Sequence, residues 1–64
     1  MSESSLPKLE PLLTIPEVAV ACQVSEKTVR RWIERRELLA AKLGAQWRIR
    51  TRDLELFIRD NLNW

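Results

Sequence analysis

The chain has 64 residues, of which 45% are hydrophobic, and a formal net charge of +2, so we expect one small domain with little room for a deep catalytic pocket. A single cysteine excludes an internal disulfide, and the absence of histidine excludes the usual zinc-ligand sets and histidine-dependent catalysis. No apolar run approaches the roughly 20 residues of a membrane span, and we expect a soluble, cytoplasmic, non-enzymatic protein that needs no metal, cofactor, small-molecule substrate or membrane.

The first helix is predicted to follow a short lead-in. Residues 1–11 have no periodic apolar pattern and predict a flexible segment, so the folded domain is expected over residues 12–64. Thr14 can cap a helix that ends near Cys22, because Glu17 stands at the position from which an acid completes a capping box. We expect Cys22 itself to be a small buried hydrophobe, since no histidine or second cysteine is present to activate it.

A second helix is predicted from its cap, Ser25, to about Arg35. At helical spacing the apolar face is centred on Val29, and Arg31 lies on the opposite, cationic face. Continuing the helix to Arg36 would drive a guanidinium group into the apolar face, so the helix should end before that residue.

Residues 39–50 change from helical spacing to alternation and predict a β-hairpin whose turn is formed by residues 44–46, with glycine at the first position. The apolar inner face is expected to carry Leu39, Ala41, Leu43, Trp47 and Ile49. The basic outer face is expected to carry Lys42, Arg48 and Arg50. Trp32 and Trp47 are both expected to pack in the core, although Trp47 has the alternative of stacking near a ligand.

The last helix is predicted to start at Thr51 as its cap, with Asp53 in its first turn. A buried stripe is expected from Leu54, Phe57, Ile58 and Leu62. Leu56 lies off this stripe. Leu56 and Trp64 are either scattered exposed residues or contacts to a second copy or another protein.

These elements predict a mainly α fold with a small β-hairpin, arranged as a winged helix-turn-helix in which a two-stranded antiparallel wing lies between the second and third of three helices. The spaced elements that carry a family likeness are Leu13-Thr14, Glu17-Val18-Ala19, Val24-Ser25, Thr28-Val29, Arg31-Trp32-Ile33, Glu37-Leu38, Leu43-Gly44, Trp47-Arg48-Ile49 and Asp53-Leu54. Over residues 12–60 the chain resembles the excisionase-type helix-turn-helix family, which is related to the DNA-binding domains of MerR-type regulators.

The resemblance implies binding to double-stranded DNA, in phage or element excisionases, small transcriptional regulators or modules of larger proteins. It also implies that copies add side by side on DNA. The chain departs from the family pattern at three positions. Gln23 and Arg36 stand where the family commonly has glycine, and Arg30 stands where an aromatic residue is frequent.

The distribution of charge supports a polyanionic partner. Between Lys27 and Arg52 there are nine basic and two acidic residues, a balance of +7 in a chain whose total is +2. In a helix-turn-helix the start of the second helix enters the major groove, and a basic wing suits the phosphate backbone or the minor groove. The candidate DNA-binding residues are therefore Ser25, Lys27, Thr28, Arg30, Arg31, Arg35, Lys42, Gln46, Arg48 and Arg50.

Two functions remain open from these residues. The first is sequence-specific DNA binding of the excisionase or small-regulator type, with self-association on DNA or an integrase, recombinase or regulator as a further partner. The second is a protein-interaction module, in which the basic face meets an acidic partner or is only a solvated surface.

Overall fold

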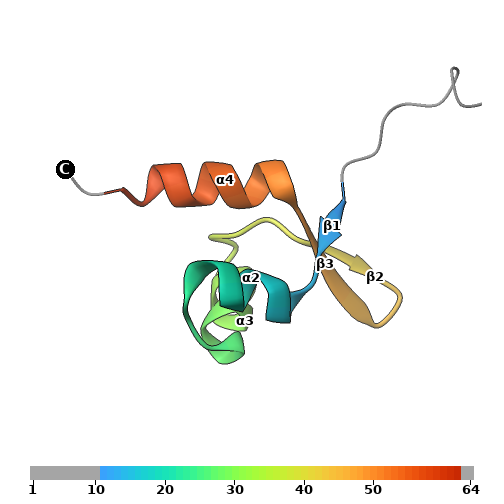
Figure 1. The fold of residues 1–64 in the computed structure, drawn as a ribbon. Coiled ribbons are helices and arrows are strands. Elements are labelled where there is room, and N and C mark those ends of the chain that lie inside the picture. The colour runs from blue at the N-terminus through green and yellow to red at the C-terminus, as the bar shows by residue number, and fades with distance from the viewer. Residues whose placement is uncertain (1–10, 63–64) are drawn as a thin grey trace, which may run out of the picture.

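The computed structural model describes residues 11–62. The lead-in predicted for residues 1–11 lies, apart from Pro11, outside the described residues, and so does Trp64. The described elements are β1 (Leu12–Leu13), α2 (Ile15–Cys22), α3 (Glu26–Glu34), β2 (Ala41–Leu43), β3 (Gln46–Arg50) and α4 (Thr51–Asp60). In Figure 1, α2 and α3 lie together below α4, and the β2–β3 hairpin projects to one side. This arrangement confirms the predicted mainly helical fold with a hairpin between its second and third helices.

Helix α2 begins as its sequence predicts. The Thr14 hydroxyl accepts a hydrogen bond from the backbone N–H of Glu17 at 3.2 Å, and the Glu17 carboxylate accepts one from the Thr14 N–H at 2.8 Å. The capping box is therefore complete and satisfies two N–H groups that a helix start leaves without partners. The helix ends at Gln23, which adopts the left-handed conformation with φ 59°. A non-glycine residue thus forms the turn at the position where the resembling family has glycine.

Helix α3 also starts and stops near its predicted bounds. The Ser25 side chain accepts from the Thr28 N–H at 3.1 Å, as an N-cap should. The last helical residue is Glu34, Arg35 forms the C-cap, and Arg36 turns the chain with φ 61°. Arg36 is exposed, so the chain avoids placing its guanidinium in the core.

The wing is part of a three-stranded antiparallel sheet with the order β1-β3-β2. Strand β1 was not predicted, because two residues are too short to show alternation. It pairs with the end of β3, with Leu12 opposite Arg50 and Leu13 opposite Ile49. The pairing joins the chain before α2 to the wing and makes β3 the central strand of three. This matters because an isolated two-stranded hairpin is at best marginally stable.

The predicted hairpin register is wrong by one residue. The turn contains only Gly44, with φ 66°, and the residue after it, so Leu43 pairs with Gln46 and Lys42 with Trp47. Because a shift of one residue moves side chains to the other face of a sheet, Lys42 shares the inner face with Trp47. Leu43 points outward and is 53% exposed.

The same correction applies to the apolar residues Ala41, in β2, and Leu39, in the segment before it. Leu39 is 64% exposed and Ala41 is also exposed, so neither joins the inner face as expected. Trp47 and Ile49 do lie on that face, with Ile49 fully buried and Trp47 half-buried against the core. Of the two strands of the wing, therefore, only β3 contributes side chains to the core.

The core lies between the helices and the inner face of the sheet. Its buried side chains are Ile15, Val18, Ala19, Val29, Ile33, Leu38, Ile49 and Leu54. Trp32 packs against this cluster and forms a tilted aromatic pair with Phe57, with ring centroids 4.7 Å apart. Trp32 and Trp47 were expected in the core, and both lie at its edge.

Helix α4 departs from its prediction at both ends. Arg50, not Thr51, is the N-cap, and Thr51 instead donates from its hydroxyl to the carbonyl oxygen of Pro11 at 3.3 Å. Of the expected buried stripe only Leu54 is buried, whereas Ile58 is 43% and Leu62 is 55% exposed. In Figure 1 the C-terminal end of α4 extends past α2 and α3, the helices that lie below it. None of the described helices is long and apolar enough to cross a membrane.

Candidate nucleic-acid interface

Helix α3 presents a cationic face away from the core. Lys27, Arg30 and Arg31 are exposed, whereas Val29 between them is fully buried. The helix is strongly two-sided, because buried residues hold one face against α2 while charged residues occupy the other. Arg35, at the C-cap of the same helix, is exposed as well. The four predicted cations of this segment are therefore all open to solvent.

The two hydroxyl residues at the start of α3 contact each other. The Ser25 and Thr28 hydroxyl oxygens lie 3.0 Å apart in a hydrogen bond, in addition to the backbone cap that Ser25 accepts from the Thr28 N–H. Ser25 is exposed and Thr28 is half-buried. The cap holds both polar side chains at the exposed N-terminal end of α3, the part that a helix-turn-helix presents to base edges.

On the wing, Lys42 lies over an aromatic ring. Its Nζ is 5.3 Å from the centroid of Trp47, a cation–π distance. The contact follows directly from the register, because the two residues are opposite each other on antiparallel strands. Lys42 remains exposed, so its charge is positioned without being neutralised.

Arg48 is held by its own strand. Its guanidinium donates to the carbonyl oxygen of Trp47 at 2.8 Å and to the side-chain oxygen of Gln46. Gln46 and Arg48 therefore act as a connected polar pair on the outer face near the hairpin tip. Both acceptors are uncharged, so the positive charge of Arg48 stays available to an anion.

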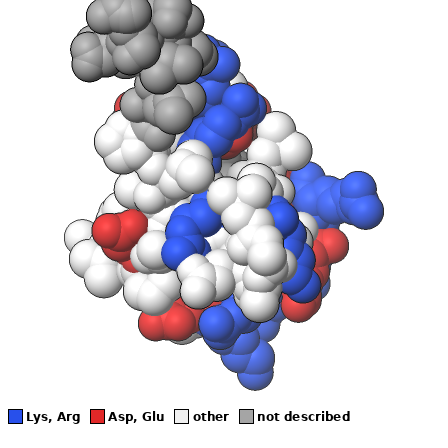
Figure 2. Space-filling view, turned by 90° about the vertical axis from the view of Figure 1, so that its right-hand side faces the viewer, with Lys and Arg blue, Asp and Glu red and all other residues white. Residues whose placement is uncertain are grey.

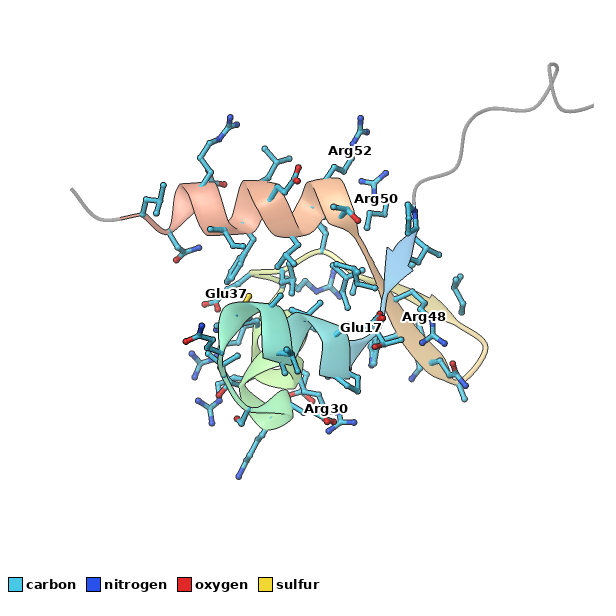
Figure 3. The ribbon with its side chains drawn as sticks, in the orientation of Figure 1. Glu17, Arg30, Glu37, Arg48, Arg50 and Arg52 are labelled. Atoms are coloured by element: carbon cyan, nitrogen blue, oxygen red, sulfur yellow. The ribbon has the colours of Figure 1, made fainter. Side chains whose placement is uncertain are left out.

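Arg50 has a different surrounding. It forms an ion pair with Asp53, whose side chain is 8% exposed. Figure 3 shows Arg50 and Arg52 near the start of α4, at the upper side of the molecule, whereas Arg30 and Arg48 lie lower, on the side of α3 and the hairpin. Arg50 thus lies with Arg52 where β3 joins α4, whereas Arg48 lies two residues earlier on the same strand, nearer the hairpin tip.

The side of the molecule that carries the hairpin has an uneven charge pattern. Figure 2 looks onto this side and shows Lys and Arg side chains flanking a central uncharged region, with Asp and Glu side chains at the margins. Leu43, which faces outward, was predicted to lie on the inner face. A turn of two residues in place of three would have predicted its outward position, because the length of the turn fixes which strand residues share a face.

An apolar groove lies on another part of the surface. It has a volume of about 670 Å³ and is lined by residues of α2, α3, α4 and the segment after α3. Cys22, Trp32 and Phe57 contribute apolar lining, and Glu37 and Asp60 contribute carboxylates. Cys22 was expected to be buried, but it is half-buried and packs against the edge of the core. This partial burial raises the pKa of its thiol.

Comparison with known protein families gives one match over the folded part of the chain. A family described as "Helix-turn-helix domain" matches residues 12–62. Searches among curated proteins and among solved structures gave no match.

Proposed function

The chain belongs to the helix-turn-helix domain family, a family of DNA-binding domains, and on this premise we propose that it places α3 in the major groove of double-stranded DNA. The observation that carries the proposal is the cationic face of α3, where Lys27, Arg30 and Arg31 are exposed opposite the buried Val29. Arginine presents two donors in a planar fork that matches the two acceptors of a guanine edge. Arg31 is the residue we assign to this contact.

In this proposal the wing lies on the phosphate backbone or in the minor groove beside the site read by α3. Lys42 and Arg48 are assigned to phosphate contacts, which position the protein without reading sequence. Their present partners, an indole ring and two neutral oxygens, leave both charges uncompensated. Arg50 is assigned a weaker role in DNA binding, because Asp53 already offsets its charge.

We further propose an excisionase-type or small transcriptional-regulator protein that acts by shaping DNA or recruiting partners, without chemistry of its own. A single domain of this size covers a small interface on DNA. Copies bound side by side, or an integrase or recombinase partner, would supply the remaining affinity. Footprinting at increasing protein concentration tests this step: stepwise cooperative extension supports it, and a fixed short footprint contradicts it.

The experiment for the central proposal is a salt titration of binding to random and selected duplexes, measured by fluorescence anisotropy. Affinity should fall with a log–log slope of about −0.9 per phosphate contact on both duplexes, and the selected duplex should bind more tightly at every salt concentration. Lys27→Ala should make the slope shallower by about one contact. Arg59→Ala removes the same charge from the exposed face of α4 and should leave the slope unchanged. Equal effects of the two variants would contradict the assignment of α3.

A second candidate function, docking of a protein partner, is favoured by the apolar groove. Its carboxylates at Glu37 and Asp60 suit a partner that presents apolar and basic side chains. The salt titration separates the two functions, because a module that only docks proteins would bind random and selected DNA alike and weakly.

A further inference from the structure

The tip of the wing carries an exposed leucine that the fold does not use. Leu43 is 53% exposed and pairs with Gln46 in the last rung before the turn. The turn itself is open, since a Cβ atom added to Gly44 would meet no atom within 4 Å. Within residues 11–62, therefore, the hairpin ends in an uncharged tip that projects into solvent.

Cations lie on both sides of this tip. Successive residues of a strand point to opposite faces, so Lys42 lies on the inner face and Leu43 on the outer face. Arg48, opposite Ala41 in the ladder, shares the outer face. Two cations thus face in opposite directions across the thickness of one hairpin.

Both cations are already positioned. Lys42 rests over the Trp47 ring, and Arg48 is bonded to the Trp47 carbonyl oxygen and to Gln46. Side chains that are ordered before binding lose less conformational entropy when they bind. Lys42 and Arg48 on the two faces, with the uncharged tip at the end of the hairpin, therefore suit a partner that has two lines of negative charge and a less polar region between them.

The minor groove of duplex DNA has this geometry. Two phosphate strands border a groove about 6 Å wide, and a narrow A·T-rich groove concentrates negative potential that attracts arginine and lysine. Proteins that bind there frequently insert a leucine or another apolar side chain at a base step and kink the duplex. Phosphate contacts alone would not require an apolar residue at the tip.

We propose that the hairpin tip is a minor-groove wedge, in which Leu43 contacts an A·T-rich base step while Lys42 and Arg48 each meet one of the two phosphate strands. This inference rests on the proposed DNA binding and assigns the wing a role in bending the duplex. It also assigns sequence preference to a residue outside α3. Because the groove is narrower than a two-stranded ribbon, insertion requires the groove to open.

The test uses the full chain and a duplex selected from a randomised library, labelled at both ends for energy transfer and carrying 2-aminopurine in its A·T-rich segment. Leu43→Ser should weaken binding about tenfold, which corresponds to about 1.4 kcal/mol. It should also lose most of the bend and of the 2-aminopurine fluorescence increase. Leu43→Met should retain both. Leu39→Ser, at another exposed leucine of the same segment, should behave as the parent protein does.

Three results overturn the inference. If Leu43→Ser binds and bends DNA as Leu39→Ser does, the wing is not a wedge although the protein is still a DNA-binding protein. Loss of affinity without loss of bending would show that Leu43 contacts DNA outside the base stack. If the parent chain binds no duplex at all, the proposed function fails and the wedge fails with it.

Discussion

Arg50 and Asp53 form an ion pair with two hydrogen bonds where the wing joins the last helix. Arg50 Nε donates to Asp53 Oδ2 at 2.5 Å, and its Nη2 donates to Oδ1 at 3.0 Å. Arg50 is the N-cap of α4 and also the strand residue opposite Leu12. The pair therefore connects β1, β3 and the first turn of α4.

Removing the carboxylate should destabilise this junction. We expect Asp53→Ala to lower the free energy of unfolding by about 1–2 kcal/mol, a value below that of a fully buried pair because the Arg50 side chain is 53% exposed. Urea unfolding followed by circular dichroism measures the change. The matched control is Glu55→Ala, an exposed acid of the same helix, which should change stability by less than about 0.5 kcal/mol. Equal losses from both variants would show that the pair adds nothing.

Two variants at one position separate folding from DNA contact. Ser25→Ala removes the cap of α3 and should cost about 1 kcal/mol of stability. Ser25→Asp keeps a side chain that caps equally well, so stability should be retained while the new negative charge repels phosphate and weakens DNA binding. Thermal unfolding and anisotropy titrations give the two readouts. Unchanged DNA affinity for Ser25→Asp would place this residue away from the duplex.

The left-handed turn between α2 and α3 predicts a stabilising substitution. Gln23 has φ 59°, a conformation that costs a non-glycine residue roughly 1–2 kcal/mol. Glycine avoids this cost but loses more freedom on folding, so Gln23→Gly should raise the free energy of unfolding by about 0.5–1 kcal/mol. Gln23→Ala keeps the unfavourable backbone and should show no gain in the same denaturation experiment. If Gln23→Ala raised the free energy of unfolding as much as Gln23→Gly, the gain would come from removing the glutamine side chain and not from relieving the left-handed backbone.

Arg31 and Arg48 should affect DNA binding in different ways. Arg31→Ala should lower the preference for the selected duplex over random DNA by about 1–3 kcal/mol, because a guanine contact is lost. Arg48→Ala should weaken binding to both duplexes by a similar factor and reduce the salt slope by about one contact. Competition titrations measure both quantities. Uniform losses from the two variants would mean that α3 does not read the sequence.

The partial burial of Cys22 has a consequence for stability at alkaline pH. Its pKa is raised in the folded protein by desolvation, so the unfolded chain ionises first as pH increases. The stabilisation from the neutral thiol is complete below the unfolded pKa and is lost as pH rises through the folded pKa. We expect the parent protein to lose stability over this alkaline range more than Cys22→Ala does, as measured by urea unfolding at several pH values. Parallel pH profiles would contradict this expectation.

The helices of the candidate site could be predicted from neighbouring residues. The bonds that start α2 and α3 join residues three apart, Thr14 with Glu17 and Ser25 with Thr28. The exposure of Arg31 followed from its spacing to Val29 within one helix. Such features depend on local geometry, which a sequence states directly. The roles assigned to these side chains at DNA remain predictions.

The sequence by itself determined where α2 and α3 begin and end and which face of α3 is cationic, because those properties depend on residues within one or two helical turns. Tertiary structure alone decided that Lys42 faces Trp47, that Leu43 faces solvent and that the end of α4 lies beyond the core. A strand's register depends on the length of its turn, and a helix face is buried only where another element reaches it. Alternation of apolar residues along a strand is the same in either hairpin register, and helical periodicity is the same whether or not another element covers the apolar face. Neither pattern could therefore identify the residue opposite Lys42 or the part of α4 that stays exposed.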